Sequence, residues 1–152
     1  MPSNDEAVRR LSPREAFERV EQDAHLYVDV SSVPEFDQGH PTGAYNVPLR
    51  EPGSEGPRDN AEFLRVMRAC FAEDTKLVLG CRTGQRSLEA ARMLQRAGFK
   101  AVVEQRAGFS GARGPFGELT EPGWQAAGLP SATLAEAGRD YAALLTRALQ
   151  RS

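Results

Sequence analysis

Short apolar runs alternate with amphipathic stretches along most of the chain, and this alternation restricts the possible folds more than any other feature of the sequence. Strands are predicted over residues 26–30, 44–48, 76–80 and 101–103, and helices over residues 13–22, 60–71 and 87–97. The run Leu77-Val78-Leu79 is apolar without interruption, as expected of a central parallel strand. Strands that alternate with helices in this way form a parallel sheet, so we expect an α/β protein.

The two ends of the chain are expected to differ from its middle. Residues 1–11 are expected to form a flexible N-terminus, and a single domain is expected over residues 12–130. Ser12-Pro13-Arg14-Glu15 is a capping box that starts the first helix. In residues 131–152, leucine and tyrosine recur at helical spacing up to residue 150. This spacing predicts a C-terminal helical extension that is appended to the sheet.

The composition is that of an ordinary globular domain. Of the 152 residues, 40% are hydrophobic and 26% are charged, which is enough apolar side chain to bury one core. The formal net charge of -2 gives no general reason to expect a nucleic acid or a membrane as a partner, and we expect neither. No apolar run follows the N-terminus or approaches the roughly 20 residues of a membrane span. The only cysteines, Cys70 and Cys81, lie in different settings, and a reducing cytoplasm suits a free thiol, so we expect a cytoplasmic protein.

One of these cysteines carries the strongest chemical signal. Cys81 follows the strand 76–80 and begins the loop Cys81-Arg82-Thr83-Gly84-Gln85-Arg86, which leads into a helix. Ligands bind at the carboxyl ends of strands in open α/β sheets, and a helix N-terminus offers unpaired N–H groups and a positive dipole end. Arg82 and Arg86 add positive charge, and Gly84 lets the loop turn with its N–H groups aimed at the sulfur. The loop therefore favours a thiolate and predicts that Cys81 is a nucleophile.

Three motifs, in this order along the chain, resemble those of the rhodanese family. The first comprises Asp29-Val30, Glu35-Phe36, Gly39-His40, Gly43-Ala44 and Asn46-Val47-Pro48. The second is the active loop, which in the family commonly reads Cys-x-x-Gly-x-Arg followed by Ser or Thr, and which here contains Cys81, Gly84, Arg86 and Ser87. The third comprises Gly108-Phe109, Trp124 and Gly128-Leu129-Pro130. The resemblance covers about residues 12–130 and implies the rhodanese-like fold, a central five-stranded parallel sheet flanked by helices on both faces.

The resemblance also implies a sulfurtransferase. The Cys81 thiolate would attack the outer sulfur of thiosulfate or of a persulfide donor, and the resulting enzyme persulfide would pass its sulfur to a thiol or to cyanide. No metal or organic cofactor is expected for this reaction. The donor would be held by backbone N–H groups and cations of the loop residues Arg82, Thr83, Gly84, Gln85, Arg86 and Ser87. The physiological donor and acceptor stay open, as do a sulfur-relay protein partner and a homodimer.

Other polar residues are expected to support the site. Asp29 ends a buried strand, where it should bind loop backbone beneath the active site. His40 is expected to be structural, because a preformed thiolate needs no general base. Ser87 is expected to cap the helix, with direct contact to the persulfide as the alternative. Arg86 is expected to be a stronger donor ligand than Arg82, because a cation is unfavourable at a helix N-terminus unless it has such a task. Cys70 lies on an apolar helix face and is expected to be a packed thiol.

The chain departs from the family pattern in places. Ser31 stands where the family usually has an arginine, so any ion pair of that arginine is absent. Ala107 stands where a glycine is common. Glycine and proline are frequent over residues 106–128, which are expected to be mostly loop, and residues 112–123 within them look like an insertion. We hypothesise that this insertion shapes substrate access.

Two other classes of function compete with sulfur transfer. Cysteine phosphatases and arsenate reductases also place a thiolate in an anion-binding loop, and such phosphatases require Cys-x5-Arg. Here four residues separate Cys81 from Arg86, and the shorter loop favours a single sulfur over a tetrahedral oxyanion. The main alternative is a non-catalytic or sulfur-relay docking module, although such modules typically lose the cysteine that this chain keeps.

Overall fold

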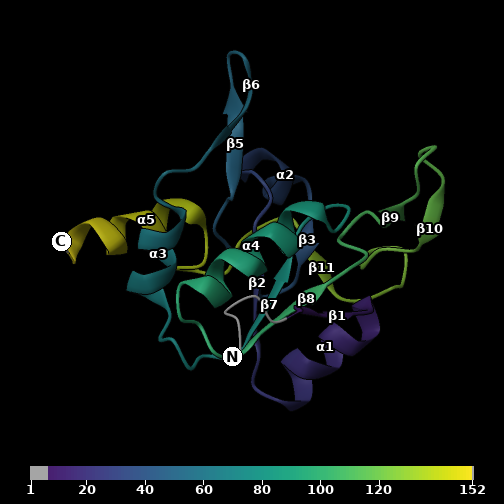
Figure 1. Cartoon of the computed structure of the whole chain (residues 1–152), viewed down its shortest axis with the longest axis horizontal. Coiled ribbons are helices and arrows are strands. Elements are labelled where there is room, and N and C mark those ends of the chain that lie inside the picture. Colours follow the sequence, from purple (N-terminus) through teal and green to yellow (C-terminus); the bar gives the residue numbers. More distant parts are fainter. Residues whose placement is uncertain (1–6, 152) are drawn as a thin grey trace.

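A parallel sheet forms the centre of the computed structural model, which describes residues 7–151 (Figure 1). Its five strands lie in the order β1-β8-β7-β2-β4, and every neighbouring pair is parallel. Their bounds are β1 Arg9–Leu11, β8 Val102–Gln105, β7 Leu77–Gly80, β2 Leu26–Asp29 and β4 Tyr45–Asn46. The α/β class and the five-stranded parallel sheet expected from the sequence are therefore confirmed.

Helices cover both faces of this sheet. Three of them pack on one face: α3 Phe63–Cys70, α4 Gln85–Arg96 and α5 Tyr141–Gln150. The other face is covered by α1 Pro13–Gln22 and α2 Val33–Gln38. Successive strand residues point to opposite faces, so Leu77 and Leu79 join the first buried cluster whereas Val78 joins the second. This burial on both sides explains the uninterrupted apolar run of β7.

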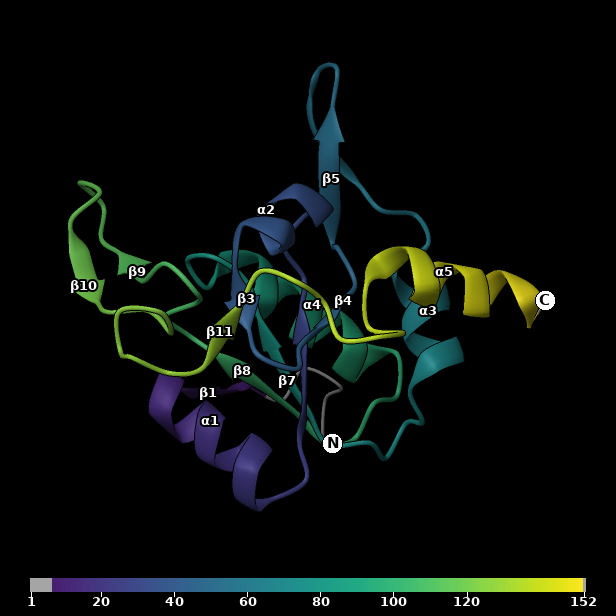
Figure 2. The same cartoon turned by 180° about the vertical axis from the view of Figure 1, so that it is seen from behind.

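Two hairpins project from this body (Figures 1 and 2). The first pairs β5 Arg50–Gly53 with β6 Gly56–Asp59, in a stretch for which no strand was predicted. The second pairs β9 Ala112–Arg113 with β10 Leu119–Glu121. It lies inside the segment expected to be an insertion and mostly loop, so the insertion is partly ordered as a hairpin.

The chain ends differ from the sequence-based boundaries. Residues 9–11 are not a flexible arm but form the edge strand β1, whereas residues 1–6 lie outside the described part. The C-terminal helix begins at Tyr141 and not at residue 131, because Gly138 has a left-handed φ of +81° and the Asp140 side chain caps α5 by accepting a hydrogen bond from the Ala143 N–H.

The segment before α5 joins the fold through its backbone. Strand β11 Ser131–Ala132 pairs antiparallel with β3 His40–Pro41. Helix α5 then packs on α3, and its Leu144 and Ala148 are buried in the core. The extension is thus an integral part of the packing. None of the helices described over residues 7–151 combines the length and the apolar content needed to cross a bilayer.

Candidate active site

Cys81 lies between the end of β7 and the start of α4, and its side chain is buried. Helix α4 begins at Gln85, with Gly84 at its N-cap position. The Cys81 Sγ accepts hydrogen bonds from the backbone N–H of Gly84 at 3.2 Å and of Ser87 at 3.4 Å. The loop thus turns backbone dipoles onto the sulfur, an arrangement that suits an anionic sulfur. Thr83 and Gln85 were also expected to provide N–H groups, but these two hydrogen bonds come from Gly84 and Ser87.

Glycine is required at one point of this loop and at one point of the turn after β8 that packs against it. Gly84 has a left-handed φ of +91°, and a Cβ there would collide with the carbonyl oxygen of Arg106. Gly108 also has a positive φ, and its Cβ would meet the carbonyl oxygen of Arg82. This close approach lets the turn after β8 anchor the loop: the Phe109 N–H donates to the Cys81 carbonyl at 2.8 Å, and the Ser110 N–H donates to the Arg82 carbonyl at 2.9 Å.

Arg86 forms an ion pair with Glu35 from α2. Its two terminal nitrogens donate to the two carboxylate oxygens at 2.7 and 3.0 Å. Burial acts to raise the pKa of Glu35, but hydrogen bonds from Arg86 and Ser32 outweigh it and lower this pKa to about 2. Arg86 was expected to face the sulfur donor as the stronger cation of the loop. Its charge is instead largely neutralised by Glu35, because α2 brings a carboxylate to the N-terminus of α4.

Arg82 takes a different position from that of Arg86. Its guanidinium lies 4.8 Å from the centre of the Phe109 ring, a cation–π contact. Within the described chain, one terminal nitrogen of Arg82 is buried without a hydrogen-bond partner. The positive charge of Arg82 acts to lower the pKa of Asp29, whereas burial of this carboxyl group raises it. Arg82 therefore leaves a cation beside the cysteine loop that a polar or anionic group could still bind.

Asp29 and His40 both lie in supporting positions. One carboxylate oxygen of Asp29 accepts a hydrogen bond from the Ser31 N–H at 2.9 Å, and burial raises the pKa of Asp29. The His40 ring stacks on Phe36 with 3.6 Å between ring centres, and its Nδ1 lies 2.7 Å from the Phe36 carbonyl. These contacts lie in the segment between β2 and β4, and they occupy one nitrogen of His40.

Ser87 does not cap α4, as had been expected from its position. It is the third residue of the helix and fully buried, because the chain turns into the helix already at Gln85. Its Oγ lies 3.3 Å from the Cys81 Sγ and also donates a short hydrogen bond to the carboxylate of Glu104. The alternative expectation was a direct contact with a persulfide on Cys81, and the contact between Ser87 and the Cys81 sulfur is compatible with it.

Glu104 is a site residue that the sequence did not reveal. It lies in β8 and is fully buried, yet it is bound on both of its oxygens. One oxygen accepts a hydrogen bond from Ser87, and the other pairs with the Arg10 Nε at 2.6 Å. Arg10 and Glu104 are direct neighbours across β1 and β8. The available signal was an acidic residue directly after the apolar run Ala101-Val102-Val103.

Comparison with known proteins identifies this arrangement. The family model described as "Rhodanese-like domain" matches residues 12–113, about two thirds of the chain and all of the cysteine loop. The chain belongs to the rhodanese-like domain family.

Relatives and solved structures support the same membership of this rhodanese-like chain. It is 38% identical over 86 residues to Thiosulfate sulfurtransferase 16, chloroplastic, of Arabidopsis thaliana, covering 57% of this chain and 72% of the relative. It is 30% identical over 86 residues to Protein HIGH ARSENIC CONTENT 1, mitochondrial, of the same plant, covering 57% of this chain and only about half, 51%, of that relative. Rv0390 from M. tuberculosis superposes with a TM-score of 0.69 at 26% identity, covering 85% of this chain and 100% of Rv0390.

These relatives contradict the expected cytoplasmic location. Their names place one in the chloroplast and another in the mitochondrion. The expectation rested on a free thiol and on the absence of an apolar leader, and neither property separates the cytoplasm from other compartments that keep thiols reduced. The prediction of a cytoplasmic protein was therefore wrong.

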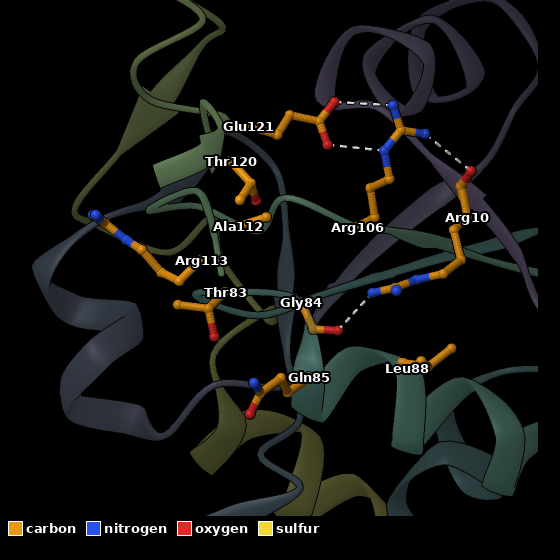
Figure 3. Close-up of a pocket in the computed structure, with 10 residues that line it drawn as sticks. All are labelled: Arg10, Thr83, Gly84, Gln85, Leu88, Arg106, Ala112, Arg113, Thr120 and Glu121. Atoms are coloured by element: carbon orange, nitrogen blue, oxygen red, sulfur yellow. Dashed lines mark hydrogen bonds and ion pairs between the residues drawn. The ribbon is translucent and has the colours of Figure 1, made fainter. Parts of the chain in front are cut away.

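Two pockets flank the cysteine loop of this rhodanese-like chain. A cavity of about 640 Å³ lies between the loop and the β9–β10 hairpin, lined among others by Arg10, Arg106 and Arg113 (Figure 3). Figure 3 shows Arg106 bound to Glu121 by two hydrogen bonds, at 2.8 and 2.9 Å. A second cavity, of about 650 Å³, lies between α2 and the β5–β6 hairpin; its lining includes Pro34, Glu35, Pro52, Pro57 and Arg86. Gln85 borders both cavities.

The second cysteine, Cys70, makes packing contacts with the buried core. Cys70 is partly buried, its Sγ lies 3.6 Å from the Leu144 carbonyl, and burial raises the pKa of its thiol. This matches the packed thiol expected from its helix face. Over residues 7–151, no group of three or more histidine, cysteine, aspartate or glutamate side chains is placed to hold a metal ion.

Proposed function

We propose that this rhodanese-like chain is a sulfurtransferase that moves sulfane sulfur from thiosulfate or a persulfide donor to a thiophilic acceptor through a persulfide on Cys81. The observation that carries the proposal is the pair of backbone hydrogen bonds, from Gly84 and Ser87, that converge on the Cys81 Sγ. A fixed set of N–H dipoles around a sulfur stabilises negative charge there without reorganisation during the reaction. A relative that is named a thiosulfate sulfurtransferase supports the same chemistry.

The reaction proceeds in two displacements on sulfur. In the first, the Cys81 thiolate forms a bond to the outer sulfur of thiosulfate, the S–S bond of thiosulfate breaks, and sulfite leaves with the bonding electron pair. In the second, cyanide or a thiolate forms a bond to the outer sulfur of the persulfide, and the electron pair of the enzyme S–S bond returns to the Cys81 Sγ. The donor would approach through the cavities on either side of the loop, which adjoin Gly84, Gln85 and Arg86.

The geometry of Arg86 also argues against phosphate chemistry. A phosphate-binding loop uses its arginine to hold two oxygens of the oxyanion. Here both terminal nitrogens of Arg86 donate to Glu35. The anion-binding capacity that Cys-x5-Arg phosphatases need is thus occupied, in addition to the loop being one residue shorter.

The test is mass analysis of the protein after exposure to thiosulfate or to glutathione persulfide. We expect a gain of one sulfur atom, located on the Cys81 peptide and removed by cyanide. Cys81→Ser should gain none, whereas Cys70→Ala, the matched control, should be loaded as the wild type is. Absence of an adduct on wild-type protein with every sulfane donor would contradict the proposal.

Two outcomes would redirect it. A persulfide that passes its outer sulfur slowly to small acceptors but rapidly to a protein thiol would indicate a sulfur-relay module. Because the name of one relative refers to arsenic content, arsenate is included with an aryl phosphate as a possible substrate. Turnover of either compound that disappears in Cys81→Ser would favour oxyanion chemistry over sulfur transfer.

A further inference from the structure

The Ser87 hydroxyl lies between two groups that can each carry a negative charge. Its Oγ donates its only hydrogen to the Glu104 carboxylate, and the same Oγ lies 3.3 Å from the Cys81 Sγ. Towards the sulfur, Ser87 can therefore present only a lone pair. A thiol donates to a lone pair, whereas a thiolate does not. The contacts are complete when Cys81 holds a proton and Glu104 is ionised.

The opposite arrangement also satisfies the hydrogen bonds among the same three groups. If the proton resides on Glu104, this carboxylic acid donates to the Ser87 Oγ, and the Ser87 hydroxyl turns to donate to the Cys81 thiolate. If both Cys81 and Glu104 are ionised, one hydroxyl hydrogen faces two acceptors, and two negative charges lie close together in a buried region. That state is costly, because burial strengthens repulsion between like charges.

Glu104 is held in place for this exchange. Arg10 binds Glu104 through its Nε at 2.6 Å. One of the terminal nitrogens of Arg10 donates to the Gly84 carbonyl at 2.9 Å (Figure 3). Gly84 itself donates to the Cys81 Sγ. One arginine therefore fixes both the carboxylate and the loop that cradles the sulfur. Burying a carboxylate is unfavourable unless it is paired, and Arg10 and Ser87 provide that pairing.

We propose that Cys81, Ser87 and Glu104 form a relay that shares one proton, with Glu104 as the positioning residue that takes up the proton of Cys81. When a donor is attacked, the proton of the Cys81 thiol passes to the Ser87 Oγ while the Ser87 proton passes to the Glu104 carboxylate. The thiolate so formed attacks the outer sulfur of the donor. After the sulfur is discharged, the proton returns by the same route. The relay rests on the proposed role of Cys81 as a nucleophile.

Several other charged or titratable groups act on this pair from the surrounding elements. They are Arg10 from β1, Tyr27 from β2, Arg86 from α4 and Arg106 after β8, while Asp29 from β2 acts on Tyr27 and Arg86. Arg10 pairs directly with Glu104, and Arg106 with Glu121. These partners are the same in both proton arrangements. Protonation of Glu104 turns its ion pair with Arg10 into a charge-assisted hydrogen bond to a neutral acid, whereas the Arg106–Glu121 pair stays charged. The net charge of Cys81 and Glu104 together is the same in both arrangements, because the thiolate replaces the carboxylate.

The competing explanation is that Glu104 only joins two strands through Arg10. Glu104→Gln separates the two explanations. A glutamine keeps an oxygen for Arg10, and its NH2 group donates to the Ser87 Oγ as the protonated acid would. This variant therefore fixes the arrangement in which Ser87 donates to the sulfur, and it also removes the opposing charge. If Glu104 only joins the two strands, Glu104→Gln should change the stability of the protein but not the reactivity of the Cys81 thiol.

The experiment measures the rate of Cys81 alkylation by iodoacetamide against pH, in a Cys70→Ala background. We expect Glu104→Gln to raise the rate near pH 7 by about tenfold, which corresponds to a shift of about one pH unit in thiolate formation. Ser87→Ala should lower the rate. Adding Glu104→Gln to Ser87→Ala should raise the rate by a smaller factor than Glu104→Gln does in the wild-type background. Asp23→Asn removes a carboxylate that pairs with Lys76, before β7 and at the opposite end of that strand from Cys81, and should leave the profile unchanged.

Superimposable alkylation profiles for wild type and a folded Glu104→Gln would overturn the relay. Equal effects of Glu104→Gln with and without Ser87 would also do so, because the carboxylate would then act through space alone. If Glu104→Gln does not fold, infrared difference spectra of the wild type decide the matter: a carboxylic acid C=O band must appear as the thiolate forms. Alkylation needs no sulfur donor, so a failed relay is distinguishable from a failed sulfurtransferase assignment.

Discussion

Arg86 and Glu35 are joined by two hydrogen bonds of 2.7 and 3.0 Å, so the cation at the end of the cysteine loop is tied to the helix that follows β2. The two residues are 51 positions apart in sequence. Their pairing leaves a neutral unit at the edge of the proline-lined cavity, where an isolated arginine would have offered a full positive charge. The pairing also makes each partner sensitive to the loss of the other.

Removing Arg86 is therefore expected to impair donor use more than removing Arg82. Arg86→Ala leaves a half-buried Glu35 carboxylate that repels an anionic donor, and kcat/KM for thiosulfate should fall by about tenfold or more. Arg82→Ala removes a cation that rests on Phe109 and should have a smaller effect. Adding Glu35→Gln to Arg86→Ala should recover part of the loss. Steady-state kinetics with thiosulfate measures all three; equal losses for the two arginines would contradict the expectation.

The same ion pair predicts that part of the folding stability is lost in acid, as Glu35 is protonated. The pKa of Glu35 is lowered in the folded protein to about 2 from an ordinary value of 4.5. A depressed carboxyl pKa contributes stability that is fully present above pH 4.5 and is lost as the pH falls towards about 2. Because the side chain of Glu35 is about one third exposed, we expect about 1–2 kcal/mol. Urea unfolding at a series of pH values should show a shallower loss over this window for Glu35→Gln than for the wild type.

Substitution of Gly84 tests the loop backbone. In Gly84→Ala the alanine must keep a left-handed backbone conformation, and its Cβ meets the Arg106 carbonyl. We therefore expect a loss of about 2–4 kcal/mol in unfolding free energy and loss of sulfur loading. Gly117→Ala is the matched control, because Gly117 has a φ of +78° but open space around its Cβ position. It should cost about 1 kcal/mol and leave loading intact. Similar stabilities for the two variants would show that the clash at Gly84 is relieved by local movement.

The β9–β10 hairpin is expected to influence the choice of donor. Its residues Ala112, Arg113, Thr120 and Glu121 line the arginine-rich cavity beside the cysteine loop. Shortening residues 112–123 removes one wall of that cavity, so the ratio of kcat/KM values for thiosulfate and glutathione persulfide should change by about threefold or more, a difference of at least about 0.6 kcal/mol. Competition between the two donors measures this ratio directly. An unchanged ratio in a folded variant would assign the hairpin another task.

The sheet and the cysteine loop could be predicted from the sequence because both depend on local patterns. The apolar run of β7, the glycine at position 84 and the helix that follows lie within one short segment. Glu104 could not be recognised, because its meaning depends on Arg10, which is 94 positions away in a segment expected to be flexible. The role of Ser87 was misjudged by the same kind of local argument, since the helix starts two residues earlier than its polar side chain suggested. The C-terminal helix was predicted too long because leucine spacing continues through Leu134, although Leu134 is 83% exposed and Gly138 interrupts the helix.

The packing of α5 has a practical consequence for work with this protein. The family match ends at residue 113, but Leu144 and Ala148 lie in the same buried cluster as Cys81, and Trp124 is held by a 2.8 Å hydrogen bond to the Pro130 carbonyl. A shortened form that ends at the family boundary would expose this apolar surface to water and would tend to aggregate on expression. Affinity tags and reporter domains should therefore be placed after α5, so that the segment beyond the family match can pack into the buried cluster that includes Cys81.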